Sequence, residues 1–309
     1  MSAFTYVSFA EQWEQRATIR TRPRRRLEND NRLIYPLSRQ PLAMSAVLQR
    51  ACPEQRDFIL LQTLYKFIND IVIFETEIVD KTARNIAKGR FGVAFPLPCR
   101  YDAMTVVVDE DYHALVAMDF LQQTIAATGI EPIDMPQEIE LSRAIPAVVA
   151  RAPEPLKAAM ELICVAIAEN TVTNDVAAFA KDDSVKPSIK GLMADHLADE
   201  GRHSSFWAAL TRLYWANASQ PDREVIAGLL PVFIEQYLTN DIQKAFDIRL
   251  IDALPVPASV AEALKREVAE LAFPIGPSHP LVMNIVRFFR RSSLLDAPCV
   301  NTALASYLT

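Results

Sequence analysis

Three side chains in one short segment have the types and the spacing of metal ligands. The segment reads His-x-x-x-Glu-x-x-His, with His196, Glu200 and His203 at its fixed positions. An α-helix turns once every 3.6 residues, so these three positions share one face. The neighbouring positions on that face are apolar: Ile189, Leu192, Met193, Phe206 and Trp207. Burying two imidazoles and a carboxylate there is costly unless they are bound, and a metal ion is the usual partner.

A similar pair occurs earlier in the chain. Glu110 and His113 form a Glu-x-x-His pair on a face that is otherwise apolar. The apolar positions are Val106, Val107, Ala114 and Ala117. One such pair arises easily by chance, but two pairs on separate apolar faces use three of the four histidines. The fourth, His279, lies in a Gly-Pro-Ser-His-Pro turn, and we expect it at the surface.

Two further segments each offer one inward-facing carboxylate. The helical face of Glu75 is apolar, whereas the face of Glu77 is charged, so we predict Glu75 inside and Glu77 in water. The Glu75 face carries Ile68, Ile71, Val72, Ile78 and Val79, and the Glu77 face carries Asp70, Asp80, Lys81 and Arg84. Glu169 also lies among apolar neighbours. Either glutamate, taken alone, could be a chance polar residue on an apolar face.

Together these residues predict four helices that face one another with metal ligands. A glutamate from each of two helices and Glu-x-x-His from each of two others is the two-metal arrangement of ferritin-like bundles. The predicted set is Glu75, Glu110, His113, Glu169, His196, Glu200 and His203. An oxygen-rich site of this kind favours iron or manganese over zinc. A buried polar cluster without metal is the alternative, but its four carboxylates would need protons or other cations to coexist.

The composition favours long helices to hold these residues. The chain has 309 residues but only seven glycines, which disfavours an all-β fold with many tight turns. We predict an all-α single domain at 41–309, with residues 1–40 as an N-terminal arm of that domain. Its expected helices cover residues 41–50, 54–87, 103–128, a short segment from 142, 155–180, 188–216, 222–252, 258–273 and 280–291. Ser259 and Glu262 read as a capping box.

Charge and cysteine content limit the possible partners. The net charge of −6 argues against nucleic-acid binding, and four scattered cysteines without a Cys-x-x-Cys spacing indicate a reducing compartment. No signal peptide or membrane-spanning run is expected, which predicts a cytoplasmic protein. Six arginines cluster in the arm: Arg16, Arg20, Arg22, Arg24, Arg25 and Arg26. We favour a solvated arm or a homodimer contact there over docking of an acidic carrier protein.

The extra histidine, His196, narrows the resemblance to one family. The order Glu…Glu-x-x-His…Glu…His-x-x-x-Glu-x-x-His resembles the p-aminobenzoate N-oxygenase (AurF-like) family over roughly residues 40–215. The spacings from Glu75 to Glu110 and from Glu169 to His196 also resemble that family's. The resemblance implies a ferritin-like fold and a di-iron centre, with mixed manganese–iron or manganese as alternatives. The implied ligands are the seven residues named above.

The resemblance also implies a reaction. Family members use reduced iron, dioxygen and electrons from outside the protein, such as from a ferredoxin or reductase, to oxidise an amine to the hydroxylamine, nitroso or nitro level. The implied substrate is an arylamine, an amino acid or a carrier-protein-tethered amino acid in secondary-metabolite biosynthesis. Two alternatives remain: a di-iron C-hydroxylase, desaturase or oxidative-cleavage enzyme, and a non-catalytic ferritin-like iron-binding protein.

Overall fold

The elements of the chain are helical wherever the structure describes them. The computed structural model describes residues 6–272 and 274–308, except for the side chains of residues 173–175 and 178. Within this range the only β-bridge joins Leu33 to Val185. The α-helices are α1 (Ala10–Arg16), α2 (Thr18–Thr21), α3 (Ala46–Ala51), α4 (Arg56–Ile73), α5 (Asp80–Ala87), α6 (Leu97–Thr128), α7 (Glu140–Val149), α8 (Lys157–Ala180), α9 (Pro187–Asn217), α10 (Gln220–Tyr237), α11 (Asp241–Asp252), α12 (Ala258–Glu270), α13 (Pro280–Arg291), α14 (Pro298–Ala303) and α15 (Ala305–Leu308). The predicted all-α fold class is confirmed.

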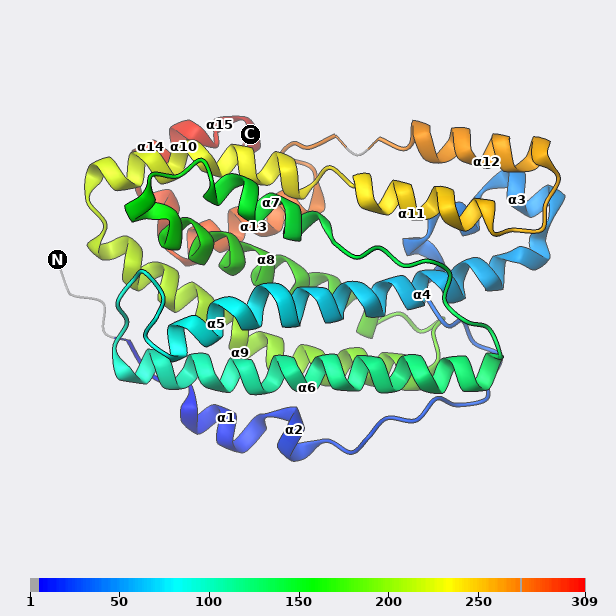
Figure 1. Ribbon diagram of the computed structural model, residues 1–309, viewed down its shortest axis with the longest axis horizontal. Coiled ribbons are helices and arrows are strands. Elements are labelled where there is room, and N and C mark those ends of the chain that lie inside the picture. Colours follow the sequence, from blue (N-terminus) through cyan, green and yellow to red (C-terminus); the bar gives the residue numbers. More distant parts are fainter. Residues whose placement is uncertain (1–5, 273, 309) are drawn as a thin grey trace.

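Four long helical runs form the centre of the molecule. One run is α4, the π-helical segment η4 (Phe74–Val79) and α5; the others are α6, α8 and α9. The first run packs against α6, and α8 packs against α9 (Figure 1). The remaining helices surround this bundle, and the 3₁₀ turns are η1 (Leu37–Arg39), η2 (Pro41–Met44), η3 (Pro53–Gln55), η5 (Glu154–Leu156) and η6 (Leu294–Asp296). No described helix has the length and apolar character needed to cross a bilayer.

Two apolar clusters divide the core along these helices. One cluster contains the stretches 73–107, 139–168 and 206–238 together with residues from α13 to α15. The other contains buried residues of 35–71, 176–193 and 246–268. Each long helical run passes from one cluster to the other. The buried polar residues at 75, 109–113, 169 and 196–203 lie at these crossings, so they form a polar layer between two apolar regions.

Two helix starts differ from the predictions because of local backbone chemistry. Helix α6 begins at Leu97, six residues before the predicted start, with Pro98 in its first turn. Proline is tolerated there because a first-turn N–H has no helical partner. The predicted capping box at Ser259 and Glu262 is wrong. Pro257 occupies the N-cap position of α12, and no side chain caps that helix.

Two predicted long helices are interrupted. The predicted helix 222–252 is two helices, α10 and α11, because Asn240 adopts a left-handed conformation with φ of 57°. Asparagine tolerates this conformation better than most residues. The predicted helix 54–87 contains the π-helical segment η4. A π segment inserts one residue into an otherwise continuous helix. The apolar periodicity on either side still indicates a helix, so it does not reveal the inserted residue.

The N-terminal arm lies against the bundle. Helices α1 and α2 contact both α6 and α9, and Figure 1 shows them running beside α6. Tyr6 and Ser8 donate hydrogen bonds of 2.5 and 2.8 Å to the carboxylate of Asp102 in α6. Ala17 and Thr18 are buried. The arm is therefore docked on the bundle at a few positions, while most of its arginines, for which a solvated arm is predicted, are exposed.

Candidate metal centre

The structure brings all seven predicted ligands into the polar layer of the bundle. Segment η4 supplies Glu75, helix α6 supplies Glu110 and His113, and helix α8 supplies Glu169. Helix α9 supplies the remaining three, His196, Glu200 and His203. Each of the seven residues is at most 8% exposed. They form two groups, and within each group the potential ligand atoms lie within 4.8 Å of one another.

The first group consists of Glu75, His113 and His196. The Oε1 atom of Glu75 lies 3.3 Å from Nε2 of His196 and 3.8 Å from Nδ1 of His113. The two imidazole rings are stacked, with centroids 4.3 Å apart. One carboxylate and two nitrogens therefore converge from three helical runs, which is a suitable donor set for a transition-metal ion.

The second group consists of Glu110, Glu169, Glu200 and His203. Nδ1 of His203 lies 2.9 Å from Oε1 of Glu110 and 3.3 Å from Oε1 of Glu200. The same oxygen of Glu200 also lies 3.3 Å from Nε2 of His196, in the first group. Glu110 likewise reaches His113, at 3.2 Å. Glu110 and Glu200 of the second group thus contact histidines of both groups.

Glu75, and not Glu77, enters the site from the π-helical segment. Glu75 is 1% exposed, whereas Glu77 in the same segment faces solvent, as predicted. The hydroxyl of Thr76 donates a 2.6 Å hydrogen bond to the carbonyl of Val72 within this stretch. Single π turns inside α-helices occur frequently at functional sites. Here the π turn lies at the residue that supplies the carboxylate of the first group.

The electrostatics of the layer call for cations. Burial raises the pKa of Glu75 and Glu169 well above the usual range, because the charged form loses its hydration. Burial acts in the same direction on Glu200, but the neighbouring His196 and His203 outweigh it and hold that pKa well below normal. Four carboxylates this close need balancing positive charge, from protons or from metal ions.

The donor atoms fit a metal centre. The Oε2 atoms of Glu75 and Glu200 are buried, and no hydrogen-bond donor reaches either of them among the described residues. A buried carboxylate oxygen without a hydrogen-bond partner is energetically costly, so each of these two oxygens is available to bind a metal ion. The mixture of carboxylates and imidazoles suits iron or manganese. The residues present therefore match the centre that the spacing predicts.

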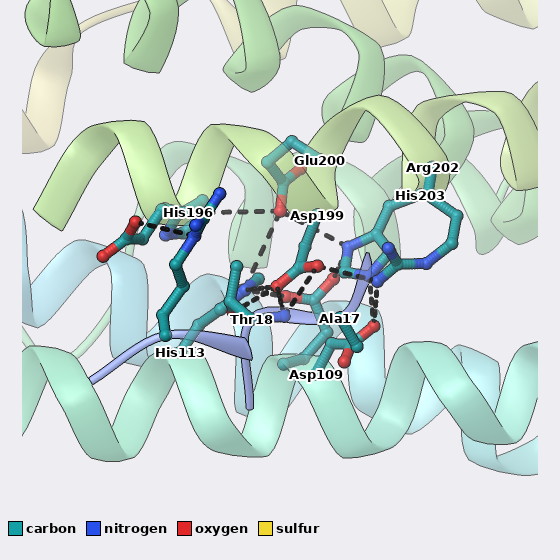
Figure 2. A network of polar contacts seen from close by, with 12 residues as sticks. Ala17, Thr18, Asp109, His113, His196, Asp199, Glu200, Arg202 and His203 are labelled. Atoms are coloured by element: carbon teal, nitrogen blue, oxygen red, sulfur yellow. Dashed lines mark hydrogen bonds and ion pairs between the residues drawn. The ribbon is translucent and has the colours of Figure 1, made fainter. Parts of the chain in front are cut away.

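Two aspartates behind the histidines were not predicted from the sequence. Nε2 of His113 lies 3.1 Å from Asp199, and Nε2 of His203 lies 3.1 Å from Asp109. Arg202 joins the two aspartates by hydrogen bonds from its Nη2 atom (Figure 2). Histidine ligands commonly donate their second ring nitrogen to a carboxylate, which fixes the ring and its tautomer. In both histidines this leaves Nδ1 directed at the glutamates.

A signal for these aspartates exists in the sequence. Asp109 directly precedes Glu110, and Asp199 directly precedes Glu200. Both helices therefore read Asp-Glu-x-x-His, and the aspartate of each helix contacts the histidine of the other. The repeated pattern could have identified the pair, although not its crossed contacts.

A cavity of about 340 Å³ adjoins the first group. His113 and His196 form part of its wall. Most of the rest is apolar and comes from α4, α6 and α9, with Ile68, Ile71, Ala117, Leu192 and Met193 among the lining residues. Residues 22–25 of the arm close one side. Ligand sites are commonly apolar cavities with a few polar groups, and this one reaches two candidate ligands.

The arginine cluster of the arm is partly neutralised by the bundle. Arg25 donates two hydrogen bonds, of 2.6 and 2.9 Å, to Asp195, and Arg24 donates two, of 2.8 and 2.5 Å, to Asp119. These pairs reduce the positive charge that the arm offers to an acidic partner. His279, which we expect at the surface, is partly exposed, and its Nδ1 atom accepts a 3.2 Å hydrogen bond from the backbone N–H of Leu281 and caps α13.

Comparison with known proteins gives a consistent result. Residues 7–272 match the family described as P-aminobenzoate N-oxygenase AurF. A curated relative, 4-aminobenzoate N-oxygenase from Streptomyces thioluteus, is 25% identical over 210 residues. That match spans 67% of this chain and 62% of the relative, slightly under two thirds of its length.

Proposed function

Because the chain belongs to the p-aminobenzoate N-oxygenase (AurF) family, we propose that it is a non-haem di-iron oxygenase that oxidises an amine nitrogen. The proposed substrate is a small arylamine, the class that includes the 4-aminobenzoate of the named relative. An amino acid, free or tethered to a carrier protein, is the wider possibility within the same reaction. The arm's paired arginines favour the free small molecule.

One observation carries the proposal: two adjacent donor groups lie in one buried layer, and Glu110 and Glu200 of the second group contact histidines of the first. Two metal ions held in neighbouring sites can act together on one small molecule. Bound iron would supply dioxygen binding and electron transfer at this place. Glu75, His113 and His196 would hold one ion, and Glu110, Glu169, Glu200 and His203 would hold the other.

The chain's own residues prepare the amine for reaction. The cavity brings a substrate of arylamine size against His113 and His196. Its apolar wall excludes water from around the ring of the bound arylamine, next to the two histidines. Conversion of R–NH₂ to R–NHOH consumes one O₂, two electrons and two protons and releases one water. An external donor, such as a ferredoxin with its reductase, supplies the electrons.

The first experiment measures metal content and then the product. Protein expressed with added iron should contain about two irons per chain, as expected for ferritin-like di-iron sites. The reduced protein, mixed with dioxygen and p-aminobenzoate as the probe, should give products carrying oxygen on nitrogen by mass analysis. Glu200→Gln should lose both metal and product. The exposed Glu77→Gln should keep both.

Each contrary outcome has a distinct meaning. A protein without iron, or with a single zinc, would overturn the di-iron centre. Iron uptake followed by oxidation at carbon would indicate a hydroxylase or desaturase instead. Iron uptake without oxygen consumption that depends on any amine tested would indicate an iron-binding protein without this activity.

A further inference from the structure

We infer that two residues of the N-terminal arm, Trp13 and Thr18, position the metal-ligand histidines, one in each donor group. They do so through the buried aspartates Asp109 and Asp199, so that docking of the arm and binding of metal stabilise each other. The inference rests on the proposed metal centre. It assigns the arm a role in that centre rather than in solution or at a partner surface.

The first connection runs through Thr18. Its hydroxyl donates a hydrogen bond to Asp199, and its backbone N–H lies 3.2 Å from both oxygens of that carboxylate. Asp199 in turn contacts Nε2 of His113 at 3.1 Å. Figure 2 shows this part of the arm beside α9, with Thr18 directed at Asp199. Thr18 and Asp199 are 2% and 0% exposed, so water does not substitute for these contacts.

The second connection runs through Trp13. The indole Nε1–H of Trp13 donates a 2.9 Å hydrogen bond to Oδ1 of Asp109. The other oxygen of Asp109 lies 3.1 Å from Nε2 of His203. Asp109 is 0% exposed, whereas Trp13 is half-buried at the surface of the bundle. The arm therefore reaches a ligand of the second group by the same two-step route.

Arg202 makes the two connections one network. This guanidinium, only 7% exposed, donates to Asp109 and to Asp199. Two buried carboxylates with one guanidinium retain a net negative charge, so each carboxylate needs further donors. The arm supplies those donors from outside the bundle. Without them, each aspartate would lose part of the support that fixes its orientation toward its histidine.

The consequence is a thermodynamic linkage between the arm and the metals. An arm that holds the imidazoles in place raises metal affinity. By the same coupling free energy, bound metal must strengthen the docking of the arm. Residues 10–21 should then exchange their amide hydrogens more slowly in the metal-loaded protein than in the same protein after chelation.

Matched variants test the connection. Trp13→Phe and Thr18→Val remove one donor each and keep most of the side-chain volume. Tyr6→Phe and Ser8→Ala are the controls, because these arm residues donate to Asp102, two helical turns before Glu110. The readout is the dissociation constant for Fe(II), measured without oxygen by competition with a coloured chelator. We expect the dissociation constant of each test variant to be about 10-fold higher than that of the wild type, as for other groups behind metal ligands.

Further measurements separate positioning from general damage. Thr18→Ser restores the hydroxyl and should recover the wild-type constant, and the controls should stay near it. Metal should slow exchange in residues 10–21 of the wild type, a comparison that needs no variant. The inference is overturned if Trp13→Phe and Thr18→Val bind Fe(II) as the controls do, or if metal leaves that exchange unchanged. A wild type that binds no metal would instead overturn the proposed function together with this inference.

Discussion

At the scale of residues, the pattern of helical faces indicates which side chains turn inward but not which residues support them. Glu75 and Glu169 are predicted inside because their helical neighbours are apolar, and burial confirms this. Asp109 and Asp199 lie next to ligands in sequence, about 100° around the helix, where a solvated face is the simpler expectation. They are buried only because the neighbouring helix and the arm cover them. Such long-range contacts leave no periodic signal.

His196 provides a direct test of the first donor group. Replacing His196 by Ala removes one of the three side chains around that group. The loss of Fe(II) affinity there should exceed the roughly 10- to 100-fold effect of losing a group behind a ligand. Amine oxidation should cease, while far-UV circular dichroism keeps its helical signal. Unchanged activity would show that the ligand set is wrong, and Glu77→Gln serves as the control.

A buried aspartate away from the centre predicts how stability depends on pH. Burial raises the pKa of Asp247 to about 6, although its contacts with Gln243 and Gln40 oppose the rise. The folded protein therefore binds this proton more tightly than the unfolded chain, and stability falls as pH rises from about 4 to about 6. Asp247→Asn removes the buried charge and keeps an acceptor for both amides.

This variant should gain up to about 3 kcal/mol in unfolding free energy at pH 8 and nothing at pH 4. Urea unfolding at both pH values measures the gain. Asp134→Asn, at an exposed position, should change little at either pH. Lower stability of Asp247→Asn at pH 8 would mean that the carboxylate forms stronger interactions than its burial costs.

At the scale of elements, helices could be predicted wherever the periodicity of apolar residues agrees with the prolines and glycines that end helices. The predicted segment 280–291 coincides with α13, and 188–216 differs from α9 by one residue at each end. The errors in predicted helix bounds fall where the backbone departs from a regular α-helix or begins one earlier than expected. Pro98 lies in the first turn of α6 rather than preventing the helix, and η4 inserts a π turn into an apparently uniform helix. Neither event changes the composition of the segment, so the sequence pattern does not mark it.

Two glycines allow a test of backbone geometry, because replacing each by alanine should change the stability of the protein in opposite directions. Gly129 ends α6 at φ of 69°, and a Cβ atom there would meet no atom of the described residues within 4 Å apart from its chain neighbours. Gly129→Ala should therefore cost about 1 kcal/mol through backbone strain alone. Gly201 lies exposed within α9, also in open space. Gly201→Ala should gain roughly 0.5–1 kcal/mol. Thermal unfolding measures both, and changes of equal sign would contradict the argument.

At the scale of the whole molecule, the fold class and the meeting of four helices could be predicted because the ligands specify their own geometry. When four separate helices each carry inward-facing metal ligands, a bundle is the arrangement that brings all of these ligands into a common layer. The cavity could not be predicted in this way. Its wall combines α4, α6, α9 and residues 22–25 of the arm, and nothing in the spacing of the arm indicates that it returns to the centre.

Filling the cavity should separate substrate binding from metal binding. Ala117 lines the cavity on α6 and is 5% exposed. Ala117→Phe should abolish turnover of p-aminobenzoate while leaving the iron content near the wild-type value. Overpacking of this kind typically costs about 1–3 kcal/mol, so activity is compared well below the unfolding temperature. Ala127→Phe, at an exposed position of the same helix, is the control. Retained turnover in Ala117→Phe would place the substrate elsewhere.

The candidate ligands are divided between two helical hairpins, and this division limits how early the two donor groups can form during synthesis. The hairpin of α4 to α6 carries Glu75, Glu110 and His113, and the hairpin of α8 and α9 carries the other four candidate ligands. Each donor group draws from both hairpins, so neither hairpin completes a group alone. During synthesis the first group can be completed only after His196 has left the ribosome, and the second only after His203 has, once the hairpins have docked. In the proposed centre, bound metal ions would therefore join two hairpins that lie far apart in the sequence.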